Sequence, residues 1–361
     1  MAGSSEVTKQ ELEDVKKEIE GMKDNLSKVN KDMDEVKVMM TQMSEKLNML
    51  EQLYKQPSPA EGMVNTPKQD ILVASGNEGR NSNRSTEIYS WKKNYWFRVP
   101  AMNEEHVRAS SFIHQDRLFV VAESGDTIET LDLNKLPPLE WEIFPIELPF
   151  TRDAHQTVVC QQSVIHIGGV DCDNYNQSNL ISELQLTSPG AAKELCQMPE
   201  PRAYHGAEVI EDKVLILGGL NSGDETMDGV LEFDPTTKKC KEMPKLPFAS
   251  RRMATVRWGD EVVVLGGIDK DNQSRSDVFM YNSKTGKITA LPSMFEKRCA
   301  CCAVITGDTI VVMGGVDDEH EILSSVECFT MGSSSWEYLP AMNDARAQAV
   351  AEVLPSSRKY V

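Results

Sequence analysis

The sequence predicts an all-β fold, a six-bladed β-propeller of four-stranded blades, preceded by an α-helical coiled coil. A short apolar segment ending in Gly-Gly recurs four times, with first glycines 48 to 50 residues apart. Short strand-like segments separated by turns follow each copy, and an unbroken heptad pattern occupies the N-terminal region. Self-similarity at such a fixed period is the signature of a repeat architecture.

Each repeat is built on an anchor strand, of which Lys213-Val-Leu-Ile-Leu-Gly-Gly219 is the clearest copy. Two degenerate copies come first: Ser75 replaces the first glycine of Ile71–Gly76, and Leu118–Glu123 has neither glycine. The six anchor positions are 46 to 50 residues apart: 75, 122, 168, 218, 266 and 314. The repeat glycines are Gly168, Gly169, Gly218, Gly219, Gly266, Gly267, Gly314 and Gly315. Because a ring crowds its inner strands, we expect these glycines to serve packing.

The remainder of each repeat is equally regular. A second strand follows about a dozen residues after the anchor, and a third often holds an aromatic residue, as at Trp96, Trp141 and Trp336. A Leu-Pro or Met-Pro turn then precedes an arginine and a fourth strand. The aligned arginines are Arg108, Arg152, Arg202, Arg251, Arg298 and Arg346. Four short strands in a unit of this length predict one propeller blade per repeat.

These residues give the sequence a resemblance to the kelch repeat family over residues 70–354. The resemblance rests on the glycine pairs, on Tyr89, Phe233 and Tyr281, on the tryptophans, and on turns such as Leu339-Pro-Ala-Met-Asn-Asp-Ala-Arg346. Cys240 and Ile288 depart from it, since the family usually has tryptophan at these places. Kelch propellers close by pairing the two ends of the chain, so the segment 346–354 is expected to complete the first blade. Closure also removes an unpaired sheet edge.

Residues 5–55 contain no proline and repeat apolar residues in heptads, with Leu12, Ile19 and Leu26 among the a positions and Met22 among the d positions. No g–e' pair of a parallel assembly is like-charged, so we expect self-association through residues 12–54. Dimers, trimers and tetramers remain open, and a single amphipathic helix is the alternative. Three prolines and a glycine within residues 56–69 predict a linker.

The composition limits the classes of partner and compartment. The net charge is −18, which disfavours a surface for binding nucleic acid. Neither a secretory signal nor an apolar stretch of membrane-spanning length is present. We therefore expect a cytoplasmic protein that binds neither nucleic acid nor membrane, with its eight cysteines as free thiols.

No catalytic or metal-binding constellation is evident. The glycine pairs lack the lysine of a phosphate-binding loop. The six histidines are scattered, and His166 lies on an anchor strand, which favours burial. Cys299-Ala-Cys-Cys302 has no second cluster at zinc spacing, so buried thiols are expected, with redox sensing as the minor alternative. We predict neither a cofactor nor a metal.

The loops after the anchor strands are the best candidates for function, because in kelch relatives they lie on a face that binds peptide partners. Four of the six are acidic, which favours a partner with a basic segment; a solvated rim is the alternative. The candidate partner-binding residues are Arg80, Arg84, Asp171, Asp173, Tyr175, Asn221, Asp224, Asp269, Asp271, Asp317, Asp318 and His320.

The prediction for function is a non-catalytic protein-interaction module, multimerised by the coiled coil. The resemblance also implies two alternatives, a substrate adaptor of a cullin ubiquitin ligase and an actin-associated protein. Such adaptors use a BTB domain, for which there is no room before Asp70. A metal-dependent propeller enzyme is a lesser alternative.

Overall fold

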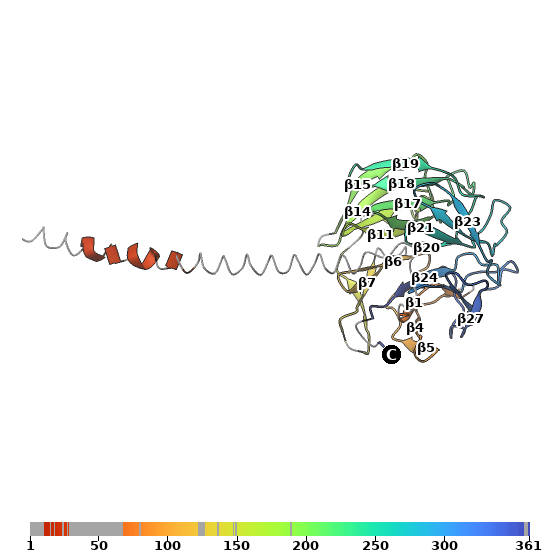
Figure 1. The fold of residues 1–361 in the computed structure, drawn as a ribbon, viewed down its shortest axis with the longest axis horizontal. Coiled ribbons are helices and arrows are strands. Elements are labelled where there is room, and N and C mark those ends of the chain that lie inside the picture. The colour runs from red at the N-terminus through yellow and green to blue at the C-terminus, as the bar shows by residue number, and fades with distance from the viewer. Residues whose placement is uncertain are drawn as a thin grey trace, which may run out of the picture. The chain divides into compact units, whose positions relative to one another are not determined.

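The computed structural model describes residues 11–28, except 15, 18, 24 and 27, and residues 68–361, except 79–80, 122–126, 136, 147, 149, 188–189 and 357–359. The chain divides into two units, Met1–Glu61 and Gly62–Val361. Every described residue of 11–28 is helical (Figure 1). The remainder of the predicted coiled coil, and the linker up to residue 67, lie outside the described residues.

The second unit is a β-propeller of six four-stranded antiparallel sheets, which confirms the all-β, six-bladed part of the predicted fold class. Each sheet is one blade, with strands ordered from the innermost to the outermost. Blade 1 consists of β28 (Val350–Val353), β1 (Ile71–Ala74), β4 (Thr86–Ser90) and β5 (Tyr95–Val99). Blade 2 consists of β6 (Ser110–His114), β7 (Arg117–Val121), β8 (Ile128–Asp132) and β9 (Trp141–Phe144). Blade 3 consists of β11 (Gln156–Cys160), β12 (Ser163–Ile167), β14 (Leu180–Gln185) and β15 (Ala191–Gln197).

The other three blades repeat the pattern. Blade 4 consists of β16 (Gly206–Ile210), β17 (Lys213–Leu217), β18 (Val230–Asp234) and β19 (Lys239–Met243). Blade 5 consists of β20 (Ala254–Trp258), β21 (Glu261–Leu265), β22 (Val278–Asn282) and β23 (Ile288–Leu291). Blade 6 consists of β24 (Cys302–Thr306), β25 (Thr309–Met313), β26 (Val326–Thr330) and β27 (Glu337–Leu339). Two further sheets have two strands each: β2 (Asn77–Glu78) pairs with β3 (Asn81–Ser82), and β10 (Arg152–Asp153) pairs with β13 (Val170–Asp171).

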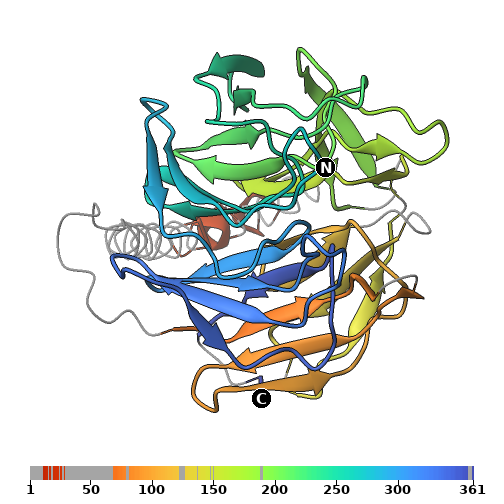
Figure 2. The ribbon, with the colours of Figure 1, turned by 90° about the vertical axis from the view of Figure 1, so that its right-hand side faces the viewer.

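The blades follow one another around a ring. In Figure 2 their colours run from orange through yellow, green and cyan to blue, so that the last blade lies beside the first. The innermost strands β28, β6, β11, β16, β20 and β24 contact one another in that order, and β24 contacts β28. Blades 1 and 4 therefore lie across the ring from each other, as do blades 2 and 5.

The C-terminal strand closes the ring as the sequence predicts. β28 pairs with β1 in an antiparallel register that joins Ala74 to Val350 and Ile71 to Val353. Blade 1 thus combines the two ends of the propeller, and β1 is hydrogen-bonded to a strand on each side.

The anchor strands are apolar on both faces because each blade is stacked between two others. In β17, Val214 to Leu217 are all buried, and alternate residues contribute to the cores on either side: Val214 and Ile216 to one, Leu215 and Leu217 to the other. Burying each such side chain stabilises the fold by about 1.5–3 kcal/mol. The sequence pattern predicted that the glycine pairs relieve crowding at the axis, but the anchor strands lie second from it.

The crowding at the glycines comes from the linker between blades. Gly314 has φ +60°, and a Cβ there would lie 2.2 Å from the Arg346 carbonyl oxygen. Gly315 has φ +99°, and its Cβ would lie 2.7 Å from the Cys299 carbonyl oxygen. The Gly315 N–H donates to Arg346 O at 2.9 Å. A side chain would prevent this contact, so the pair serves packing, although the source of the close approach differs from the expected one.

The contact with the second glycine also corrects the arginine alignment. Its N–H donates to the carbonyl of one equivalent linker residue in five blades: His106, Arg202, Ser250, Arg298 and Arg346. Arg108 and Arg251, which were aligned as members of this set, lie two and one residues further along the chain. Pro100, Pro244, Pro292 and Pro340 each lie six residues before the equivalent linker residue, so the error came from choosing the nearest arginine and not from the spacing.

Candidate functional site

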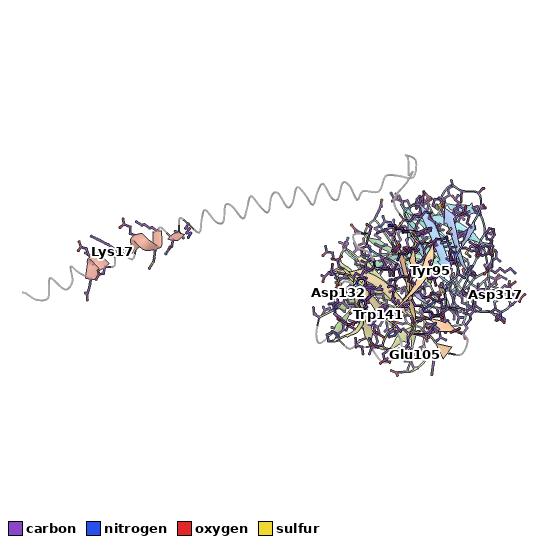
Figure 3. All side chains as sticks on the ribbon, turned by 90° about the horizontal axis from the view of Figure 1, so that it is seen from below. Lys17, Tyr95, Glu105, Asp132, Trp141 and Asp317 are labelled. Atoms are coloured by element: carbon purple, nitrogen blue, oxygen red, sulfur yellow. The ribbon has the colours of Figure 1, made fainter. Side chains whose placement is uncertain are left out.

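One face of the propeller is formed by the loops after the anchor strands and by the linkers between blades. Isolated β-bridges join the two sets, pairing Leu220 with Ala203, Ile268 with Arg251, and Val316 with Cys299. We call this the loop face. In Figure 3, Asp317 on a loop of this face and Asp132 at the end of β8 lie at opposite ends of the propeller.

The first polar residue of each predicted acidic loop holds the loop in shape. Asp317 Oδ1 accepts backbone N–H groups from Glu319 and Glu321, at 2.9 and 2.8 Å. Asn221 Oδ1 accepts in the same way from Gly223 and Glu225, at 2.9 and 3.0 Å. Since an amide does this as well as a carboxylate, the role requires an acceptor and not a charge. The residues with this role are Asp171, Asn221, Asp269 and Asp317.

A second set, made of the predicted residues Tyr175, Asp224 and His320 together with Asn272, which was not predicted, adopts the left-handed backbone conformation that turns each loop back. These residues have φ between 58° and 69°. Tyr175 is 80% exposed and His320 is also exposed. The conformation presents their side chains to solvent, so they are available to a partner.

The tips of the loops carry the charges that folding does not use. Asp173 and Asp271 are exposed, whereas Asp318 accepts from Lys297 Nζ at 2.7 Å. That lysine lowers the pKa of Asp318. Arg84 is exposed and donates to Asn103 O at 2.8 Å, while Arg80 lies outside the described residues. The predicted acidic rim therefore divides into half-buried turn residues and exposed tips.

A ring of six residues, one per blade, lies at the centre of this face and was not predicted from the sequence. Each has φ between 51° and 58°, although none is glycine. The N–H of each donates to the carbonyl of its predecessor along five of the six steps, for example from Arg252 to Tyr204 at 2.9 Å. We call this set the mouth ring: Arg108, Ala154, Tyr204, Arg252, Ala300 and Gln348.

The mouth ring surrounds a cavity of about 110 Å³ that leads to the channel. Arg108 and Arg252 come from opposite blades, as do Tyr204 and Gln348. The Arg252 guanidinium lies 4.5 Å from the centre of the Tyr204 ring, and Arg108 pairs with Asp153. Because alanine also adopts the strained conformation in this ring, the fold imposes it, and only the side chains vary. The linker residues in the correct register, with His106 and Ser250 in place of Arg108 and Arg251, would have drawn attention to the residue two places later.

The central channel has a volume of about 560 Å³ and is lined by the innermost strands of all six blades. Glu208 and Glu352 occupy equivalent positions in opposite blades, four residues after Tyr204 and Gln348. Thr255 donates to Glu208, and Ser111 donates to Glu352, each at 2.8 Å. Burial raises the pKa of both carboxyls to about 7, and the charge of Glu352 adds to the effect on Glu208.

Three histidines lie near the mouth ring but are buried. His166 is fully buried on its anchor strand, as predicted, and its ring lies 4.3 Å from that of His155. Burial lowers the pKa of His155 to about 4 and that of His205 to about 3. Among the described residues, no group of three or more His, Cys, Asp or Glu is placed to hold a metal ion.

Comparison with known proteins identifies the repeat. The Kelch motif matches residues 201–247, 249–295 and 297–343, which correspond to blades 4, 5 and 6. These three blades are therefore similar to Kelch repeats. The prediction from the sequence is confirmed at this level, and its more degenerate blades complete the same propeller.

The curated relatives are Kelch-like proteins. The chain is 25% identical to Kelch-like protein 35 of Mus musculus over 181 residues, which are 49% of this chain and 30% of the relative. It is 30% identical to human Kelch-like protein 41 over 98 residues, or 26% of this chain and 16% of the relative. The chain thus spans less than a third of the length of either relative.

A solved structure gives the fold alone. The structure of YjhT matches with a TM-score of 0.62 at 15% identity, covering 70% of this chain and 88% of that chain. In the part of the chain that the structure describes, no helix is both long and apolar enough to cross a membrane.

Proposed function

We propose that the Kelch propeller is a non-catalytic module that recognises a protein partner on its loop face. The observation that carries the proposal is that one set of loop residues holds each loop in shape while another set is exposed to solvent. Asp171, Asn221, Asp269 and Asp317 hold the loops in fixed shapes, and the residues that follow them present side chains to solvent. Rigid loops with exposed polar tips on a stacked scaffold are the usual arrangement of a binding surface.

The distribution of charge on the loop face suggests where a basic segment of a partner would bind. The exposed acids Asp173, Asp224 and Asp271 lie on the rims of blades 3, 4 and 5. The mouth ring, in contrast, holds Arg108 and Arg252. A basic segment would therefore lie along these rims and avoid the centre, because like charges across an interface cost affinity.

Capture of partners by proximity labelling, followed by pull-down with variants, tests this proposal. The triple change Asp173→Lys, Asp224→Lys and Asp271→Lys should abolish binding, because it reverses the rim charge and keeps the four side-chain acceptors, Asp171, Asn221, Asp269 and Asp317, that hold the loops. Arg252→Glu is the matched variant at the centre and should leave binding of a basic partner intact. Loss of binding with Arg252→Glu alone, with the rim variant unaffected, would show that the partner is acidic and is held at the mouth.

The N-terminal helix supports self-association as a second part of the proposal. Within its own unit, the helix exposes the a and d residues Leu12, Ile19, Met22 and Leu26 by 47–66%. A stripe at this spacing is buried when identical helices supercoil. Several linked propellers would then bind a multivalent partner with avidity.

Light scattering on the full-length protein tests the assembly. The double change Ile19→Lys and Leu26→Lys should reduce the molecular mass to that of a monomer, because it places charges in the seam. Glu20→Lys, at an exposed b position of the same helix, is the control and should leave the mass unchanged. A wild-type protein that already runs as a monomer would refute this part of the proposal.

A further inference from the structure

The junction between blades 3 and 4 differs chemically from three other junctions of the propeller, each of which is fixed by an aromatic hydrogen bond to a proline carbonyl. At the junction of blades 6 and 1, the Trp96 indole N–H donates to Pro340 O at 2.8 Å. At that of blades 5 and 6, Trp336 donates to Pro292 O at 2.7 Å. At that of blades 4 and 5, the Tyr281 hydroxyl donates to Pro244 O at 2.9 Å. In each case an aromatic side chain fixes a blade to its predecessor.

Cys240 occupies the tryptophan position in blade 4. It pairs with Phe233 across the sheet, as Trp96 pairs with Tyr89 in blade 1. Phenylalanine lacks a polar hydrogen, so neither residue can make the aromatic hydrogen bond of those three junctions. Cys240 Sγ instead lies 3.7 Å from Cys196 Sγ, on the outermost strand of blade 3. Two thiols from strands 44 residues apart in sequence are thus in van der Waals contact.

We propose that Cys196 and Cys240 form a disulfide that links the outer strands of blades 3 and 4 when the protein meets a disulfide oxidant. Both side chains are half-buried at the outer edge of the propeller, so a small oxidant reaches them. Rotation about the two Cα–Cβ bonds is the movement needed, because the sulfur atoms are already adjacent. No such contact joins the thiols of any other cysteine pair in the part of the propeller that the structure describes.

The chemistry balances with glutathione disulfide as the oxidant. The Cys196 thiolate attacks one sulfur of glutathione disulfide, which forms a mixed disulfide and releases one glutathione. The Cys240 thiolate then attacks the Cys196 sulfur of that mixed disulfide and releases the second glutathione. The two cysteines lose two electrons and two protons, and both protons end on the two glutathione thiols.

The environment of Cys240 assigns the order of the two steps. Burial, and then the neighbouring Cys196, raises the pKa of Cys240 to about 12. Its thiolate is therefore scarce, and the first attack falls to Cys196. Cys240 is held against the sulfur that it attacks. This proximity accelerates the second step and offsets the small fraction of Cys240 that is present as thiolate.

Peptide mapping of the full-length protein, equilibrated in glutathione buffers of graded ratio, tests the proposal. We expect a linked peptide containing Cys196 and Cys240 to accumulate as the buffer becomes more oxidising. Two of the eight thiols should be lost together. The Tm should rise by several degrees, since the link restricts the unfolded chain.

Two variants separate this outcome from general oxidation. Cys240→Ser should abolish both the linked peptide and the rise in Tm, and leave Cys196 as a mixed disulfide with glutathione. Cys172→Ser, at another half-buried cysteine, should leave both effects intact. The proposal is overturned if wild-type protein carries only mixed disulfides under every buffer, or if its linked peptides join other cysteines.

Discussion

Arg346 and Glu87 form a fully buried ion pair across the junction that closes the ring. Arg346 Nη2 donates to Glu87 Oε1 at 2.7 Å, and both side chains are completely excluded from solvent. The same guanidinium donates to the carbonyl oxygens of Ser75 and Ser85. Glu87 also accepts the backbone N–H groups of Asn343 and Asp344. The last linker of the propeller is thereby bound to the first blade.

The pair predicts a large loss of stability when one partner is removed. Glu87→Ala leaves a buried guanidinium without its carboxylate, which costs about 3–5 kcal/mol in the free energy of unfolding. Chemical denaturation with urea measures the loss. The exposed pair Arg98–Asp344 at the same junction is the control, because Arg98 is 57% exposed. Arg98→Ala should cost about 1 kcal/mol or less. Equal losses in the two variants would contradict a special role for the buried pair.

The extent to which the sequence predicts the fold can be judged at this junction. The glycine pairs and the missing strand of blade 1 were sufficient to predict six blades and the closure by residues 346–354, because both follow from strand periodicity. The partner of Arg346 was not predicted, since Glu87 lies 259 residues earlier, in a strand whose residues are all buried. Equivalent glutamates recur in only two other blades, at Glu129 and Glu327, so no repeat period marks them.

The candidate site was predicted in the same uneven way. Its acidic loops are visible in the sequence because they follow the glycines directly. The division between turn residues and exposed tips was not visible, since Asp171 and Asp173 are the same residue type two positions apart. The mouth ring was missed because its members share a backbone conformation and no side-chain chemistry, as Ala154 and Arg252 illustrate.

The channel carboxyls predict a stability that depends on pH. Glu208 has its pKa raised from 4.5 to about 7 in the folded state, so the folded protein binds a proton more tightly than the unfolded chain. Its unfavourable effect is therefore fully present above pH 7 and disappears as the pH falls to about 4.5. Glu208→Gln should stabilise the protein at pH 8 and have little effect at pH 4.5.

The size of this effect is bounded by the shift. It is at most about 3 kcal/mol, and smaller for a carboxyl that contacts water in the channel. Thermal unfolding of the two proteins at both pH values gives the measurement. Glu183→Gln, at a carboxylate on the third strand of blade 3 that accepts from Ser163, is the control outside the channel. A gain from Glu208→Gln that is the same at pH 4.5 and pH 8 would exclude titration as its cause.

The hydrogen bonds of the turn residues lead us to expect that the charge of a loop can be changed without changing its shape. Asp317→Asn keeps the acceptor for Glu319 and Glu321, and should leave the loop ordered. Asp317→Ala removes the acceptor and should free both amides, at a cost of about 1 kcal/mol. Hydrogen exchange at the amides of Glu319 and Glu321 distinguishes the two variants. Equal exchange rates in both would mean that the carboxylate does not hold the loop.

The buried imidazole of His205 should make the stability of the protein sensitive to acid. Both ring nitrogens lack a hydrogen-bond partner, and burial lowers the pKa of the ring from 6.5 to about 3. The unfolded chain therefore binds a proton below pH 6.5 that the folded protein refuses, so stability falls as the pH drops from 6.5 towards 3. At pH 4 the loss reaches about 3 kcal/mol.

Replacing His205 by leucine removes this loss, because the side chain keeps much of its volume and has no proton to gain. We expect His205→Leu to change the free energy of unfolding little at pH 7 and to stabilise the protein at pH 4. His114, an incompletely buried histidine at the end of β6, provides the control. His114→Leu should leave the loss of stability at acid pH unchanged. Urea unfolding at pH 4 and pH 7 makes the comparison. If the wild type and His205→Leu show the same loss in free energy of unfolding between pH 7 and pH 4, the buried imidazole of His205 is not the group that makes the propeller sensitive to acid.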